Sequence, residues 1–200
     1  MKDTTIVLAN QVNLDGTLKG QTIDRVENGV NRLNKKLTRS LTMSGGYTGH
    51  LEKPIYSFAT AMELYAISLG VNEIYLHKEP TSLDTVGQAI FTKLGLILPK
   101  SWRDLEVLSN DYHVGGVGRV REIFGFVYGK EFNLEFVGIP TAPNDPELRT
   151  ENQEKRSLDA FHNTFKDVMC GDDDAILNRL FEVHPFYKGK GPRDFVRDRK

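Results

Sequence analysis

Two polar turns of this sequence carry groups that could do chemistry. The Ser44–Gly46 turn follows the apolar segment Leu41–Met43, and glycines without a Cβ let backbone N–H groups approach and surround an anion. The Asn110–His113 turn follows a second apolar segment. The dipole of a helix disfavours a positive charge in its first turn, so His113 there stays neutral and can act as acid or base near pH 7. Alternatively, Ser44–Gly46 is only a tight turn after a strand, and His113 has only a structural role.

The loop from Glu79 to Thr85 places carboxylates and hydroxyls just before a predicted helix, where the helix dipole favours negative charge. Ser82, Asp84 and Thr85 also suit helix capping, whereas Glu79 lies before the cap. We therefore predict that Glu79 orients His113 or a water.

Together these groups define a candidate site in which the amides of Gly45 and Gly46, with Arg119, hold an anion. Asp15 and Asp111 would bind ribose hydroxyls or a divalent ion. The candidate catalytic residues are His113, Glu79 and Asp111. The candidate ligand-binding residues follow predicted strands or begin the next helix, and they are Asn10, Asn13, Asp15, Ser44, Gly45, Gly46, Ser82, Asp84, Thr85, Asn110 and Arg119.

Other motifs are weaker. The Gly115–Gly118 segment is similar to a dinucleotide fingerprint, but it does not follow the first strand, and Arg121 stands where the third glycine belongs. No lysine of the Walker type follows either glycine cluster, which argues against a P-loop hydrolase. His162, Cys170 and His184 lack the paired short spacings of a zinc site, so no metal site is predicted.

Five short segments have the apolar or β-branched composition of strands that must position these turns. They are Thr4–Leu8, Leu41–Met43, Ile74–Leu76, Leu105–Leu108 and Leu134–Val137. Between them, apolar residues recur every three or four positions, as on one face of a helix. The predicted stripes are Ile23, Val26, Val30, Leu33 and Leu37; Phe58, Met62, Tyr65 and Leu69, ending at Gly70; Val86, Ile90 and Leu94; and Val117, Val120 and Phe124.

Strands that alternate with helices predict an α/β fold of the three-layer, doubly wound, Rossmann-like type, with a mostly parallel sheet and helices on both faces. Ligands of such folds bind outside the carboxyl ends of the strands, near the point where the strand order reverses. We divide the chain into residues 1–142, the Rossmann-like domain, and residues 143–200, a helical C-terminal extension with a loosely held tail.

The composition excludes several classes of protein. With 200 residues, of which 39% are hydrophobic, the chain can bury one sizeable core. Its 26 basic and 27 acidic residues leave a net charge of -1, which argues against a nucleic-acid binder. The apolar runs are too short for a signal peptide or a membrane anchor. The single cysteine, Cys170, fits a reducing compartment, so we expect a cytoplasmic protein. A homo-oligomer is left open.

The order of these motifs resembles the SanA/YdcF/ElyC-like domain family over residues 4 to 140. The resemblance implies a Rossmann-like fold, a bacterial origin and a largely uncharacterised biochemistry that is connected in some members with the cell envelope. Many members carry an N-terminal membrane anchor, which this chain is expected to lack. The motifs that carry the resemblance are Asp15-Gly16, Arg25, Ser44–Gly46, the helix with Ala59 and Met62 that ends at Gly70-Val71, Glu79 with Ser82–Thr85, and Ser109–His113.

Three positions differ from the family pattern. Phe58 and Gly87 stand where the family has glutamates, and Gly116 stands where it has an arginine. Arg119 lies one helical turn further on and could present a guanidinium to the same side. Loss of charged groups weakens catalysis more than it changes the shape of a binding site, so these differences favour a non-catalytic binding role.

We therefore hold two main hypotheses of function. The first is a YdcF-like protein that binds a phosphorylated or nucleotide-like small molecule at the carboxyl edge of the sheet, as a hydrolase or transferase with His113 as acid or base. The second is a non-catalytic module for a nucleotide or S-adenosylmethionine. A third hypothesis is an interaction protein that uses the C-terminal helices.

Overall fold

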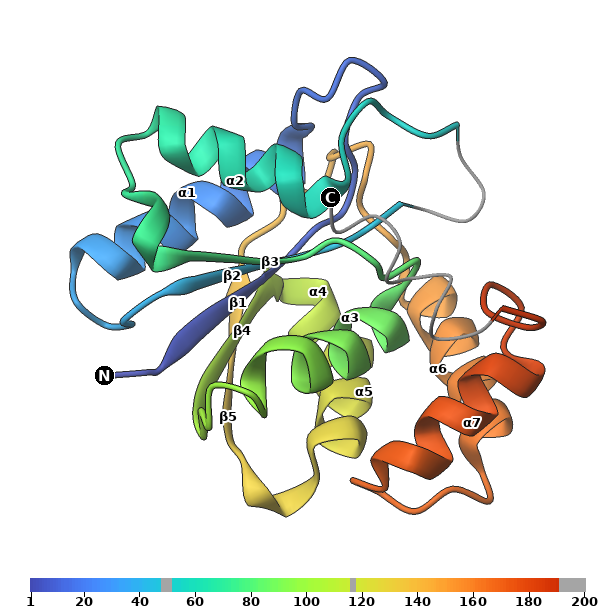
Figure 1. Ribbon diagram of the computed structural model, residues 1–200. Helices are drawn as coiled ribbons and strands as arrows, with labels where there is room; N and C mark the ends of the chain where they lie inside the picture. Colours follow the sequence, from blue (N-terminus) through green and yellow to red (C-terminus); the bar gives the residue numbers. More distant parts are fainter. Residues whose placement is uncertain (48–51, 116–117, 191–200) are drawn as a thin grey trace.

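The computed structural model describes residues 1–47, 52–115 and 118–190. Within these ranges one parallel sheet has the strand order β3-β2-β1-β4-β5 (Figure 1). The predicted α/β fold with helices on both faces of a parallel sheet is confirmed. The strands are β1 (Thr4–Leu8), β2 (Leu41–Ser44), β3 (Leu76–Glu79), β4 (Asp104–Asn110) and β5 (Asn133–Ile139).

Helices cover both faces of the sheet. One face carries α1 (Gly20–Asn34) and α2 (Phe58–Ser68), and the other carries α3 (Thr85–Thr92), α4 (Asp111–Val114) and α5 (Arg119–Tyr128) (Figure 1). The central strand β1 is buried along its whole length. Its side chains point alternately to the two faces of the sheet. Val7 joins the apolar cluster of α1 and α2, whereas Ile6 and Leu8 join that of α3 and α5.

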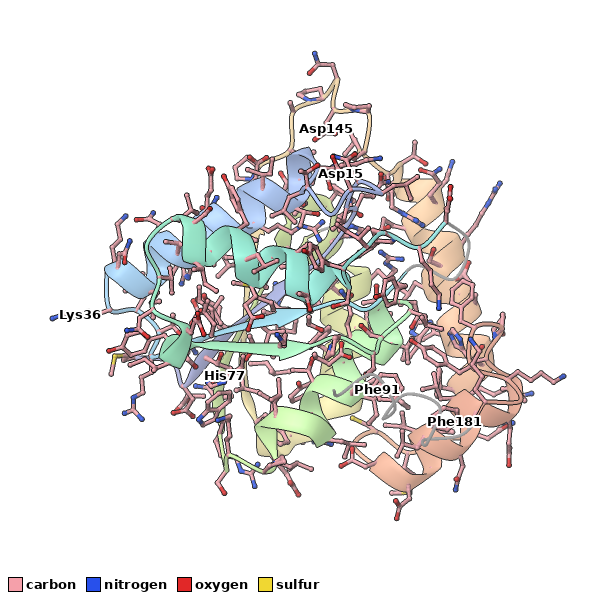
Figure 2. All side chains as sticks on the ribbon, turned by 45° about the horizontal axis from the view of Figure 1, so that its top comes forward. Asp15, Lys36, His77, Phe91, Asp145 and Phe181 are labelled. Atoms are coloured by element: carbon pink, nitrogen blue, oxygen red, sulfur yellow. The ribbon has the colours of Figure 1, made fainter. Side chains whose placement is uncertain are left out.

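The C-terminal helices share the second of these clusters. The helices α6 (Glu151–Phe165) and α7 (Asp173–Val183) bury Leu158, Phe161 and Leu180 among the apolar residues of α3 and α5. Phe91 on α3 and Phe181 on α7 lie with their ring centroids 6.5 Å apart (Figure 2). Residues 143–190 therefore extend the core of the Rossmann-like part, and the predicted tail from residue 191 lies outside the described residues.

Two element boundaries differ from the predicted ones near the start of the sheet. Helix α1 ends at Asn34, because Lys36 has a φ of 56°, which a right-handed helix does not allow, and Leu37 is exposed. The strand predicted at residues 74–76 begins only at Leu76. The residues before it form the 3₁₀ helix η1 (Glu73–Tyr75).

Two more boundaries differ around α3 and α5. Leu94 lies in the π-helical turn η2 (Lys93–Ile97), where the Lys93 ammonium donates to the Val127 carbonyl and pairs with Asp173. Helix α5 begins at Arg119 and is followed by the 3₁₀ helix η3 (Gly129–Glu131); the predicted helical residue Val117 lies outside the described residues.

The strand order reverses between β1 and β4. The chain builds β2 and β3 on one side of β1 and then returns to build β4 and β5 on the other side. In open α/β sheets this reversal opens a crevice at the carboxyl ends of the two strands. Among residues 1–47, 52–115 and 118–190, no helix is both long and apolar enough to cross a membrane.

Candidate functional site

A cavity of ≈ 460 Å³ lies at the carboxyl ends of the central strands, where the strand order reverses. Its wall combines polar groups from the loops after β1, β2 and β3 with side chains of α5, α6 and the segment after α7. The predicted site residues that line it are Asn10, Gly45, Gly46, Ser82, Asp84, Thr85, His113 and Arg119. Those that do not line it are Asn13, Asp15, Ser44, Glu79, Asn110 and Asp111.

The Glu79 cluster is a closed set of hydrogen bonds, made of Ser44, Glu79, Thr81, Ser82 and Thr92. Glu79 Oε1 accepts from the backbone N–H groups of Thr81 (2.6 Å) and Ser82 (2.9 Å), and from Thr81 Oγ1 (2.6 Å). Ser44 Oγ lies 3.1 Å from Glu79 Oε2 and 3.0 Å from Thr92 Oγ1. Burial raises the pKa of the Glu79 carboxyl, although these donors oppose the effect. The cluster joins β2, β3 and α3, and it does not hold His113.

The two glycines of the Ser44–Gly46 turn serve close packing. The Gly45 N–H donates to the Glu79 carbonyl (3.0 Å), and the Gly46 N–H donates to the Ser82 carbonyl (2.8 Å). Both amides are therefore occupied, and the predicted anion cradle does not match the hydrogen bonds of the structure. A Cβ on Gly46 would lie 2.4 Å from the Ser82 carbonyl oxygen, so only glycine fits there.

The Glu154 cluster, made of His113, Arg119, Arg149 and Glu154, brings charges together at the cavity. Glu154 lies in the first turn of α6, which Thr150 caps. Its Oε2 lies 2.9 Å from His113 Nδ1 and 3.3 Å from Arg119 Nε, and its Oε1 lies 2.7 Å from Arg149 Nε. The carboxylate that holds His113 is thus Glu154 and not Glu79.

The hydrogen bonds of this cluster are incomplete. Arg119 Nε and Arg149 Nε pair with the Glu154 carboxylate as ions but are not aligned with it as hydrogen bonds, so these two nitrogens and Glu154 Oε1 have no hydrogen-bond partner. Buried polar atoms without partners are rare in folded proteins and call for an explanation, such as a bound water or ion. The cluster therefore has hydrogen-bonding capacity that a bound water or ligand would complete.

Burial decides the protonation of His113. The pKa of the imidazole is lowered to about 4, mainly by burial and also by the positive charges of Arg119 and Arg25, against the hydrogen bond to Glu154. The predicted neutral form at pH 7 agrees with this pKa, but its main cause is burial rather than a helix dipole. For Glu154, burial opposes ionisation, but the His113 hydrogen bond and the two arginines outweigh it and lower the pKa.

This arrangement fixes the tautomer of His113. An ionised Glu154 can only accept a hydrogen bond, and it lies closer to His113 Nδ1 (2.9 Å) than the Arg119 guanidinium does (3.4 Å), so we assign the proton of neutral His113 to Nδ1 and a lone pair to Nε2. Among the described residues, no protein group bonds Nε2. The ring of Tyr112 lies against that of His113 with centroids 4.1 Å apart, and its hydroxyl donates to Gln21.

Arg25 is a cation at the floor of the cavity that is only 2% exposed. Its guanidinium donates to the Asn110 side chain (2.6 Å), the Leu8 carbonyl (2.9 Å) and Gln21 (3.4 Å), all of which are neutral. None of the ion pairs in the described ranges includes it. Burial lowers the pKa of Arg25 to about 10, so it stays charged at pH 7.

The remaining predicted residues have structural contacts. Asn110 bridges Arg25 and Thr141, and so it supports the cavity from behind. Asp111 accepts from Thr141, Asn13 bonds Thr17, and Asp15 accepts from Thr17. Asp15 is exposed in a loop near Asp145, at the opposite end of the sheet from Lys36 and His77 (Figure 2).

Four residues were missed as site residues in the sequence, namely Arg25, Arg149 and His184, which line the cavity, and Glu154, which lies behind it. Of these, Glu154 has a signal that could have revealed it. It shares a helical face with Leu158, Phe161 and Phe165, at spacings of four, three and four residues, and all of them are buried. A carboxylate on the apolar face of a helix must find a partner in the interior.

Within the described residues, no group of three or more His, Cys, Asp or Glu side chains could hold a metal ion. Comparison with known proteins found no match among protein-family models, curated proteins or solved structures. The resemblance to the SanA/YdcF/ElyC-like family therefore stays a prediction.

Proposed function

We propose that the protein binds a phosphorylated, nucleotide-like small molecule in the cavity at the strand reversal. Arg25 is the observation that carries this proposal, because a buried cation without a carboxylate partner is costly unless an anion compensates it. Guanidinium groups suit phosphate, since their planar donors match its oxygens.

The other charges around the cavity support an anionic ligand. Arg25, Arg119 and Arg149 line it, against the carboxylates of Asp84, at its wall, and of Glu154, behind it. Three arginines thus line the cavity with one carboxylate, while Glu154 and, near Arg25, Glu147 lie behind its wall. The excess positive charge favours a phosphate over a sulfonium ligand such as S-adenosylmethionine.

The apolar part of the wall suits the organic half of the ligand. It is formed mainly by α3, α5, α6 and the segment after α7, through Val86, Val120, Ile123, Phe161 and Phe186. A volume of ≈ 460 Å³ lies within the range of small-molecule sites, which combine apolar walls with a few polar groups.

A calorimetric titration with AMP and adenosine tests this function. We expect saturable binding of AMP, weaker binding of adenosine, and an increase of the AMP dissociation constant by about tenfold in Arg149→Gln. Arg156→Gln is the matched control, because Arg156 is an exposed residue of α6 that does not line the cavity. Arg25→Gln should weaken AMP binding at least as much as Arg149→Gln. Equal binding of AMP and adenosine, or tighter binding of S-adenosylmethionine, would contradict the proposal.

A further inference from the structure

A second histidine pairs with a carboxylate at the same cavity. His184 is the C-cap of α7, is 9% exposed and lines the cavity. Its Nε2 lies 3.2 Å from Asp84 Oδ2, and its Nδ1 is buried without a hydrogen-bond partner. An unpartnered buried ring nitrogen in a cavity wall is a group that a ligand can satisfy.

Asp84 is held firmly for this contact. It is the N-cap of α3, where its Oδ1 accepts from the Gly87 N–H (2.9 Å) and from the Tyr187 hydroxyl (3.0 Å). Burial keeps the pKa of Tyr187 well above its ordinary value, so the phenol remains a donor. With Oδ1 occupied, Oδ2 is the oxygen that fixes the ring of His184.

The two histidine–carboxylate pairs are close to each other. Both histidines line one cavity. Burial lowers the pKa of Arg119, which belongs to the Glu154 cluster, and the charge of Asp84 is near enough to oppose that effect. A phosphate held by Arg119 and Arg149 would therefore lie between groups of both pairs.

The pairs differ in the charge that each carboxylate offers its histidine. Glu154 is shared with Arg119 and Arg149, which cancel its charge, and His113 is neutral. Asp84 has no arginine or lysine at ion-pair distance among the described residues, and its ion-pair contact is with His184. A protonated His184 would keep Nε2–H on Asp84 and direct Nδ1–H to a ligand. His113 thus suits a base, and His184 suits an acid.

We propose that this cavity hydrolyses phosphate monoesters, with His113 as general base and His184 as general acid. The inference rests on the proposed function, because the arginines must first bind the phosphate. Water attacks phosphorus and gives a proton to His113 Nε2 as the new P–O bond forms. The P–O bond to the organic group breaks, and His184 Nδ1–H protonates the departing oxygen. The products are an alcohol and inorganic phosphate.

The dependence on the leaving group tests the two roles separately. The 5′ oxygen of AMP is a poor leaving group and needs a proton, whereas the phenolate of p-nitrophenyl phosphate leaves without one. We expect His184→Gln to lower kcat/KM for AMP by about a hundredfold and for p-nitrophenyl phosphate by less than tenfold, since general acid catalysis typically contributes at least the former factor. His113→Gln should lower both by about a hundredfold.

Two further variants keep the test independent of folding. Asp84→Asn preserves the cap of α3, because asparagine is an equally good cap, but it removes the charge that faces His184. It should reproduce the selective loss with AMP. His162→Gln, an exposed residue of α6 outside the cavity, should have the wild-type activity.

Binding of AMP without hydrolysis of either ester would overturn this inference and leave the proposed function standing. Equal losses with both esters in His184→Gln and Asp84→Asn, together with lower melting temperatures, would also overturn it, because a structural role predicts that result. Failure to bind AMP in the calorimetric titration would reject the proposed function itself, and the inference with it.

Discussion

Two of the buried glutamates among the described residues, Glu79 and Glu154, lie at the same end of the sheet but serve opposite purposes. Glu79 is surrounded by hydroxyl and amide donors of the loop that follows it and by the Ser44 hydroxyl of β2, and burial raises its pKa. Glu154 is surrounded by two arginines and a histidine from three other elements, and its pKa is lowered. The Glu79 cluster is closed, whereas the Glu154 cluster leaves Nε of both arginines ion-paired but without a hydrogen bond.

This difference shows that the partners of a buried carboxylate, more than its burial, indicate whether it belongs to a ligand site. A carboxylate that is satisfied by neutral donors stabilises a turn. A carboxylate that holds more cations than it can satisfy keeps those cations in place for something else.

The largest effect is expected from removal of the charge of Glu154. Glu154→Gln leaves Arg119 and Arg149 without their common partner and should lower the free energy of unfolding by about 4 kcal/mol. The same change should increase the affinity for AMP, because the arginines are released. Chemical denaturation and calorimetry measure the two quantities. A variant that is destabilised but binds AMP more weakly would show that Glu154 does not compete with the ligand.

The next effect concerns the pH dependence of stability. His113 has a folded pKa of about 4 and an ordinary unfolded pKa of 6.5, so the unfolded chain binds a proton that the folded protein excludes between these values. Stability is therefore lost as the pH falls from 6.5 to 4, by up to about 3 kcal/mol.

Urea denaturation across this pH range, for the wild type and for His113→Gln, isolates the contribution of His113. The difference in stability between the two proteins should change with pH in this window and become constant above it. If the stabilities of the two proteins changed in parallel with pH, His113 would have the same pKa in the folded and unfolded states.

A smaller effect is expected from the closed cluster. Glu79→Gln keeps one acceptor oxygen but presents an amide N–H₂ to a donor, and it should cost about 1.5 kcal/mol of stability. Because Glu79 does not line the cavity, the dissociation constant for AMP should stay within twofold of wild type. A large loss of affinity in a folded Glu79→Gln would break the distinction between the clusters.

The smallest effects are expected from the two exposed aspartates. Asp15→Ala and Asp111→Ala should each change stability by no more than about 0.5 kcal/mol and leave AMP binding unchanged, since their bonds are to neighbouring loop residues. Thermal melts with and without AMP suffice. If AMP no longer raised the melting temperature of one of these variants, that aspartate would take part in ligand binding.

The sequence by itself determined the α/β fold, the buried β1 strand, the cap at Asp84 and the position of His113 after β4. These features depend on local patterns, namely apolar runs, helical spacing and turn residues, which act over a few neighbouring positions. Together with the rule that ligands bind at the carboxyl ends of parallel strands, they predicted a site at the edge of the sheet where the cavity lies.

Only the tertiary structure decided which groups face the cavity. Glu154 lies 41 residues from His113, and His184 lies 100 residues from Asp84, so no local pattern relates either pair. Their contacts exist because α6 and α7 bury Leu158, Phe161 and Leu180 against α3 and α5, which brings distant polar side chains to one wall. The same packing left Glu79 enclosed by its own loop, although its position in the sequence is as favourable as that of Asp84.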